Sequence, residues 1–247
     1  MLVPAELPDE NHFRSCPSNA DFPMTQFRFR SSDGRDIAPQ EWLRVWAGLY
    51  PEKDYGSAGY EELIAKHRNL VAEDFVRIGR WKDGARTDGR WKANVASVAY
   101  PIWMQAASEM PKCPEGMGVA DFLNDWSNRK YKDEWPTRSV EKRFGLSRAT
   151  TLLHFLSGGC FPIFDSRVRT AITRLSPNST RVENTVGWYL DSYCSLFAEL
   201  AAVCGSEDFR TMDKALFSYG ARNLPFSKKK REAGQGRPRK PLAKSAD

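Results

Sequence analysis

A single acidic residue, Asp165, occupies the position in this sequence where a catalytic group is easiest to place. It follows the short apolar link Cys160–Phe164 and precedes a stretch with helical spacing that runs to Leu175. A carboxylate at the start of a helix is kept ionised by backbone N–H groups, so it can stabilise positive charge that develops on a substrate and can orient a water molecule. Asp is also a common N-cap residue, and from the residues alone this structural role is the simpler interpretation.

Basic residues are unevenly distributed along the chain. Residues 226–247 hold eight Lys or Arg and two acidic residues, which accounts for the whole formal charge of +6, so the first 225 residues are neutral overall. Within them, Arg77–Lys92 has six bases and two acids, and both Arg138–Arg148 and Asp165–Arg181 have four bases and one acid. If the fold brings these three segments together, they form a phosphate-binding face on a neutral protein.

Several classes of protein and site are excluded by composition and pattern. No apolar stretch reaches the roughly 18 residues that a membrane span needs, and the first residues lack the features of a signal peptide. The five cysteines include no CxxC pair, which favours reduced thiols and argues against a metal site. Phosphate-binding glycine loops and the GxSxG and HExxH motifs are absent from the sequence. We therefore expect no cofactor, no metal and no membrane association, and a cytoplasmic location.

Apolar spacing predicts an all-α fold for most of the chain. Residues 1–37 form an N-terminal arm in which QFRFR at Gln26–Arg30 is either one edge strand or part of the arm. Residues 38–225 form the helical domain, and residues 226–247 form a disordered basic tail. Inside the domain, Ser139–Phe144 is predicted to be a short helical turn that ends at Gly145, and Ser147 begins the next helix.

The segment Val140–Ile172 resembles the helix-hairpin-helix DNA glycosylase superfamily, the group of endonuclease III and the alkyladenine and 8-oxoguanine glycosylases. Phe144-Gly145 matches the last apolar-Gly pair of the hairpin, and FPIFD at Phe161–Asp165 matches the link and the acidic residue that follows it. Uncharacterised bacterial relatives of these enzymes share Arg80-Trp81-Lys82 and the motif at Asp213–Phe217. The helix-hairpin-helix core would span about residues 138–176.

This resemblance implies that the protein binds double-stranded DNA as a nucleoid-associated monomer, flips out a modified base and hydrolyses its N-glycosidic bond through Asp165. Arg143 replaces the first glycine of the hairpin, and Ser147 replaces the Schiff-base lysine of bifunctional members, so the enzyme would be monofunctional and leave an abasic site. Base-excision repair and defence against phage DNA are both open as its role. Hairpin and helix-start residues are predicted to bind DNA: Lys142, Arg143, Phe144, Gly145, Leu146, Ser147, Arg148, Ser166 and Arg167.

A flipped base needs a pocket, and the basic, glycine-containing loop near residue 84 supplies Trp81, Lys82 and Trp91 as candidates for it. Structural alternatives stay open for these residues. Both tryptophans are more often packing residues, Arg167 can equally belong to a solvated helix face, and His154 is expected to be a hydrogen-bonded core histidine. Two other classes of function also remain: a helix-hairpin-helix protein that binds DNA without catalysis, and a helical protein-interaction domain with a nonspecific basic tail.

Overall fold

The computed structural model describes residues 27–51, 59–83, 102–109, 117–135, 138–176, 181–206 and 208–222. These residues are mostly helical, as expected, and contain one two-stranded antiparallel sheet. In the described part of the chain no helix is long and apolar enough to cross a membrane. The tail at residues 226–247 and most of the predicted N-terminal arm lie outside the described residues.

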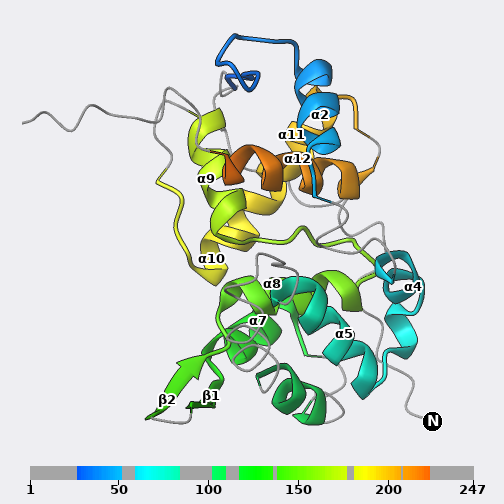
Figure 1. Cartoon of the computed structure of the whole chain (residues 1–247), viewed down its shortest axis with the longest axis vertical. Coiled ribbons are helices and arrows are strands. Elements are labelled where there is room, and N and C mark those ends of the chain that lie inside the picture. Colours follow the sequence, from blue (N-terminus) through cyan, green and yellow to red (C-terminus); the bar gives the residue numbers. More distant parts are fainter. Residues whose placement is uncertain are drawn as a thin grey trace, which may run out of the picture.

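The helices form two groups that share one core (Figure 1). The first group includes α2 (Pro39–Gly48), α9 (Ser166–Leu175), α11 (Cys194–Val203) and α12 (Phe209–Ala221). The second includes α4 (Tyr60–Ala65), α5 (Ala72–Asp83), α7 (Val119–Asn128), α8 (Leu146–Leu156) and a helix over residues 102–109. A short 3-10 helix, η1 (His67–Asn69), follows α4, and α10 (Val186–Trp188) leads into a π-helical turn, η3 (Tyr189–Tyr193).

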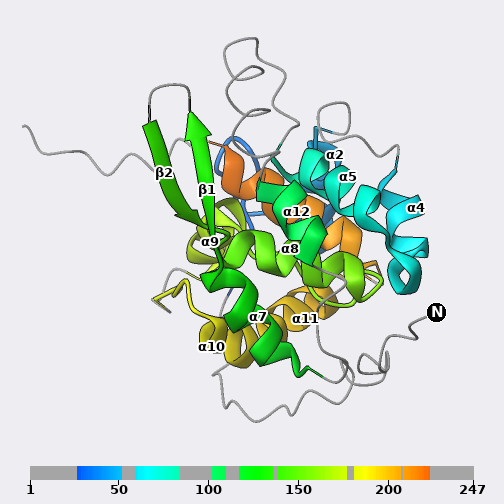
Figure 2. The same ribbon diagram turned by 90° about the horizontal axis from the view of Figure 1, so that it is seen from below.

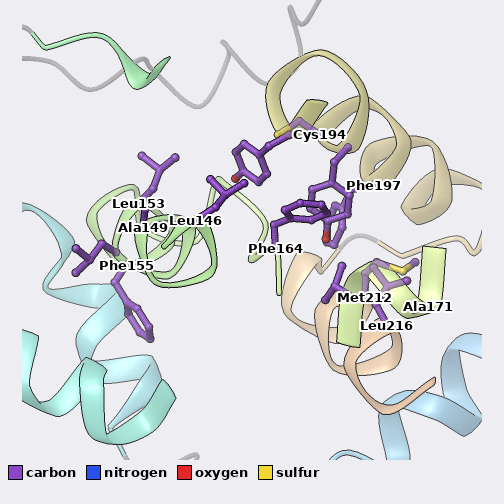
Figure 3. Close-up of a cluster of buried hydrophobic side chains, with 14 of the residues drawn as sticks. Leu146, Ala149, Leu153, Phe155, Phe164, Ala171, Cys194, Phe197, Met212 and Leu216 are labelled. Atoms are coloured by element: carbon purple, nitrogen blue, oxygen red, sulfur yellow. The ribbon is translucent and has the colours of Figure 1, made fainter. Parts of the chain in front are cut away.

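Helix α8 is the central helix of the second group. Eight of its residues are buried, from Leu146 at its start to Phe155 in its last turn. Figure 3 shows Leu146, Ala149, Leu153 and Phe155 on this helix, and Phe164 on the other side of the core, near Phe197. The chain passes between the two helix groups through the link that ends at Phe164, so this link connects the two halves of the core.

The prediction of a helical turn at Ser139–Phe144 is wrong. Residues Arg138–Arg143 form strand β2, which pairs antiparallel with β1 (Lys130–Trp135) in the register Lys130↔Arg143 to Trp135↔Arg138. A six-residue helix is too short to be stable without extensive packing, whereas the ladder satisfies the same backbone groups. The β hairpin projects from the helical body in Figures 1 and 2.

The helix that precedes Gly145 in space is therefore α7, and the hairpin is inserted between α7 and α8. The chain leaves α7 at Arg129 and returns at Phe144, whose N–H donates to the Arg129 carbonyl over 2.8 Å. Gly145 then donates to the Ser127 carbonyl over 3.1 Å and has φ of +83°, a conformation that favours glycine. Gly145 is the N-cap of α8, which begins at Leu146, one residue before the predicted start at Ser147.

For Gln26–Arg30 the sequence left an edge strand and part of the arm as alternatives, and the described residues from Phe27 onward form only a single β-bridge. Arg30 pairs with Asp36 across a turn, and Phe29 packs into the core against the indole of Trp42. The short segment thus covers α2 without forming a sheet.

Candidate active site

Asp165 is the N-cap of α9. Its backbone is extended, with φ of −114° and ψ of −179°, and its Oδ1 accepts hydrogen bonds from the N–H groups of Arg167 at 2.9 Å and Val168 at 3.0 Å. The side chain is 14% exposed, so it lies almost completely within the protein. The capping interpretation is therefore correct, and it leaves the second oxygen, Oδ2, for another partner.

That partner is Lys82, which lies 83 positions earlier in the sequence. Its Nζ is 3.1 Å from Asp165 Oδ2, and the lysine side chain is only 11% exposed. Lys82 belongs to the last turn of α5 and not to the predicted loop, because the helix continues to Asp83. The two residues that sequence analysis selected separately, one as an acid and one as a pocket residue, form a single ion pair in the structure.

The Asp165 carboxyl group is ionised at neutral pH. Burial alone would raise its pKa, but the Lys82 ammonium and the hydrogen bonds from Val168 and Arg167 outweigh burial and lower the pKa below its ordinary value. The site therefore holds a negative charge with little access to water, a condition in which its electrostatic effect on a bound group is strong.

The link that carries Asp165 is fixed by side-chain hydrogen bonds to consecutive backbone groups. Tyr189 and Tyr193 of η3 donate to the carbonyls of Pro162 at 2.8 Å and Ile163 at 3.1 Å. Burial raises the pKa of both phenols well above the ordinary value, so both remain protonated donors. The two phenols lie four residues apart, and the π-helical turn brings them both onto the link.

Two residues of α8 complete this attachment. Thr150 Oγ1 accepts from the Phe164 N–H at 3.1 Å, and His154 Nδ1 lies 2.7 Å from the Phe161 carbonyl. Together with the tyrosines, these bonds hold every residue of Phe161–Phe164, so Asp165 begins α9 from a preorganised backbone. Such fixation lowers the reorganisation that a catalytic group would otherwise need.

His154 is a hydrogen-bonded core histidine, as predicted. Burial lowers its pKa to about 4, so it is neutral at pH 7. Because Nδ1 faces a carbonyl oxygen, it carries the proton, and Nε2 accepts from the hydroxyl group of Tyr60 over 2.7 Å. Both ring nitrogens are occupied by structural hydrogen bonds, which joins α4 to the link through α8.

A second ion pair lies on α12 beside the first. Arg210 Nη1 is 2.8 Å from Asp213 Oδ2, and the two side chains are 10% and 8% exposed. The Arg210 guanidinium lies over three aromatic rings, with its Cζ 4.2 Å from the ring centre of Tyr60, 4.9 Å from that of Tyr50 and 5.4 Å from that of Trp81. Sequence analysis noted the Asp213–Phe217 motif but gave Asp213 no role, because nothing in an i, i+3 Arg-Asp pair indicates that both members are buried.

Trp81 precedes Lys82 on α5, and its ring centre lies 5.4 Å from the Arg210 guanidinium. Its indole packs edge-on against Phe155 and tilted against Tyr60, and its buried Nε1 has no acceptor among the described residues. Trp81 is therefore a packing residue in the structure, as one of the two alternatives expected. A role for Trp81 in receiving a base stays a prediction, and Trp91, the other predicted pocket tryptophan, lies outside the described residues.

The residues predicted to bind DNA fall into two places. At the start of α8, Phe144 and Leu146 are buried in the core, while Lys142 and Arg143 at the end of β2 are exposed. Arg148 donates to the Phe144 carbonyl over 3.0 Å and so braces the turn. Ser147 is half-buried, and its carbonyl accepts the hydroxyl groups of Thr150 and Thr151.

The other two lie beside Asp165. Ser166 is exposed, and the Arg167 guanidinium lies 4.1 Å from the ring centre of Phe217 on α12. The Arg167 side chain therefore packs on α12, while its backbone N–H donates to Asp165 Oδ1. Arg167 is thus tied to the site and is not a freely solvated helix-face residue.

Three comparisons with known proteins add no relative. No known protein family, no curated protein and no solved structure matches this chain. Among the described residues there is also no group of three or more His, Cys, Asp or Glu side chains that could hold a metal ion.

Proposed function

We propose that the protein is a monofunctional DNA glycosylase that excises a modified base from double-stranded DNA and leaves an abasic site. The observation that carries the proposal is Asp165, a nearly buried, ionised carboxylate on a fixed backbone whose Oδ1 caps α9 and whose Oδ2 pairs with Lys82. Breaking an N-glycosidic bond builds positive charge on the sugar, and one such carboxylate stabilises that charge and orients the attacking water.

Lys82 then serves as the counterion that keeps Asp165 ionised before substrate binds. As positive charge develops on the sugar, the carboxylate interacts with it more strongly than with the ground state, which is the condition for catalysis. Among the described residues, Lys82 is the amine that contacts Asp165, but an ammonium group in an ion pair has no free electron pair with which to attack the sugar. The reaction is accordingly hydrolysis without a Schiff base.

The start of α8 and the end of β2 supply the DNA-binding face in this proposal. The first helical turn of α8 has backbone N–H groups without acceptors in the helix and no side-chain cap, which suits a phosphate oxygen. Lys142 and Arg143 are exposed beside it. The N–H groups of Phe144 and Gly145 already donate to the carbonyls of Arg129 and Ser127, so the phosphate would be bound by N–H groups that follow Gly145.

The proposal is tested by incubating purified protein with genomic DNAs that differ in base modification and identifying released bases by mass spectrometry. We expect release from at least one DNA, no strand nicking and no borohydride-trapped adduct. Asp165→Asn should lose release by several orders of magnitude while Asp191→Asn, which changes an exposed carboxylate on η3, keeps it. An Asp165→Asn rate within about tenfold of wild type would remove Asp165 from the reaction.

A DNA-binding protein without catalysis is the second candidate. The Lys82–Asp165 ion pair favours this candidate, because each buried charge neutralises the other and both residues then have a purely structural role. In that case Lys142→Ala and Arg143→Ala would weaken DNA binding, and neither the wild-type protein nor any variant would release a base.

A further inference from the structure

Helix α9, which begins directly after Asp165, contains three arginines and no acidic residue. Two of these arginines hold α12, which packs beside α9 in Figure 1. The Arg167 guanidinium lies 4.1 Å from the ring centre of Phe217 on α12. Arg174 Nη1 donates to the Tyr219 carbonyl, near the end of α12, over 2.7 Å. Both arginines therefore have a structural role in the contact between the two helices.

Arg169, the third arginine, has no partner for its charge among the described residues. Its side chain is half-buried, and its Nε is covered by protein without a hydrogen-bond acceptor. Because Nε is the nitrogen of this side chain that is buried without a partner, the two terminal nitrogens are accessible from solvent. Arg169 lies two residues after Arg167, about 200° further around the helix, so it is on a different side of α9 from the arginine that packs on α12.

Asp165 does not neutralise Arg169, although the two are four residues apart, a spacing at which ion pairs form on helices. The Arg169 N–H donates to the Asp165 carbonyl over 2.9 Å, but the carboxylate pairs with Lys82. Lys82 and Asp165 cancel each other, so Arg167 and Arg169 leave the first turns of α9 with a net positive charge. The helix dipole favours anions and disfavours cations at this end of a helix. An anion bound here would compensate both effects.

We propose that Arg169 binds a phosphate of the DNA backbone, the one bonded to the sugar on which Asp165 acts. The identity of that sugar rests on the proposed function. Arg169 lies one helical turn after Asp165, a rise of about 6 Å, and a phosphate and the sugar of its nucleotide are covalent neighbours, so one helix start can hold both. A guanidinium donates two N–H groups to phosphate oxygens. Ser166, which is exposed three residues before Arg169, adds a hydroxyl donor on the same side of the helix.

The first test measures binding to a duplex that carries one tetrahydrofuran residue, an uncleavable analogue of the proposed abasic product. Fluorescence anisotropy between about 50 and 200 mM salt gives the affinity and the salt slope. Arg169→Gln should bind about tenfold more weakly and reduce the slope by about 1, because one phosphate contact is lost. Arg44→Gln removes the same charge from an exposed position on α2 and should match wild type. An unchanged slope in Arg169→Gln would overturn the inference.

The second test remains valid if Arg169→Gln fails to fold. A negative charge at the exposed first position of α9 suits the helix dipole, so Ser166→Asp should fold as well as wild type. It should nevertheless weaken binding of the same duplex by about tenfold, because it repels the phosphate and pairs with Arg169. The neutral variant Ser166→Asn is the control and should bind like wild type. Equal affinities of the two Ser166 variants would contradict the inference.

The third test identifies the phosphate. Replacing one backbone phosphate next to the tetrahydrofuran residue by an uncharged methylphosphonate should weaken wild type and leave Arg169→Gln unaffected, the non-additivity expected of groups in contact. Additive losses at both flanking phosphates would overturn the inference. Non-additive coupling without base release from any DNA would refute the proposed function and retain Arg169 as a phosphate contact. Base release by wild type with undiminished DNA binding by Arg169→Gln would refute the inference alone.

Discussion

The Lys82–Asp165 ion pair makes a quantitative prediction for stability. Both side chains are nearly buried, at 11% and 14% exposure, so removal of one partner leaves a charge with little water around it. Breaking a buried pair in this way costs about 3 kcal/mol or more. We expect Lys82→Met and Asp165→Asn each to lower the free energy of unfolding by about 3 kcal/mol, although the side-chain amide oxygen of the Asp165→Asn variant can still accept the helix N–H bonds.

The double variant should lose much less than the sum of the two. With both charges removed, no unpaired charge remains, so a total loss of about 4 kcal/mol and a coupling energy of about 2 kcal/mol are expected. Urea denaturation of the four proteins measures this coupling. The surface pair Lys130–Glu141, at 2.9 Å with side chains 53% and 58% exposed, provides the matched control. Its cycle should give less than about 1 kcal/mol.

Additive losses in the Lys82/Asp165 cycle would refute the argument, because they would mean that the two groups do not interact in solution. Equal coupling in the buried and the exposed cycle would show that burial does not strengthen the pair. The same variants separate stability from chemistry: Asp165→Asn protein that remains folded at the assay temperature should still lack base release.

Two further predictions concern packing and pH. Gly220→Ala should lower the free energy of unfolding by more than about 3 kcal/mol, because a Cβ 1.8 Å from the Arg167 carbonyl oxygen forces α12 away from α9. Gly48→Ala is the control and should be neutral or slightly stabilising, because a Cβ at Gly48 meets open space. Thermal melts measure both variants, and a small effect of Gly220→Ala would mean that this helix contact is looser. Burial lowers the pKa of His154 from 6.5 to about 4, so the unfolded chain binds its proton first and stability should fall by up to about 3 kcal/mol as pH drops from 6.5 to 4. Burial raises the pKa of Asp213 to about 6, with the opposite effect, because the folded protein binds this proton first and stability rises as the pH drops from about 6 to 4. Urea midpoints measured against pH should therefore fall more steeply with decreasing pH in Asp213→Asn than in wild type. Equal pH dependence in both proteins would contradict this assignment.

Local sequence patterns predicted most of the helices and the start of α9. Asp165 before a helical apolar pattern is a local signal, and the structure forms the N-cap that this signal predicts. The break before α8 is a local signal as well, because Gly145, with φ of +83°, adopts a backbone conformation that favours glycine.

Features that depend on tertiary packing were not predictable in this way. The strands β1 and β2 are rich in Lys, Arg, Asp and Glu and lack the alternation of apolar residues that indicates a strand. Sequence analysis selected Lys82 and Asp165 without showing that they meet, since their contact depends on how the two helix groups bring the last turn of α5 to the start of α9. The burial of Asp213 likewise follows from the contact of α12 with α9, to which Gly220 is the only local clue.

The inserted β hairpin has a consequence for how the chain tolerates change in length. Its two ends meet at the hydrogen bond between Phe144 and Arg129, so the chain enters and leaves the helical body at one point. Hydrogen bonds between β1 and β2 compensate the entropy that is lost when the segment between α7 and α8 is closed into a loop. Additional paired residues would lengthen the hairpin outward without displacing α7 or α8. The base of the hairpin is fixed, because Tyr131 is buried in the core, and beyond this base the hairpin can change in length independently of the carboxylate site.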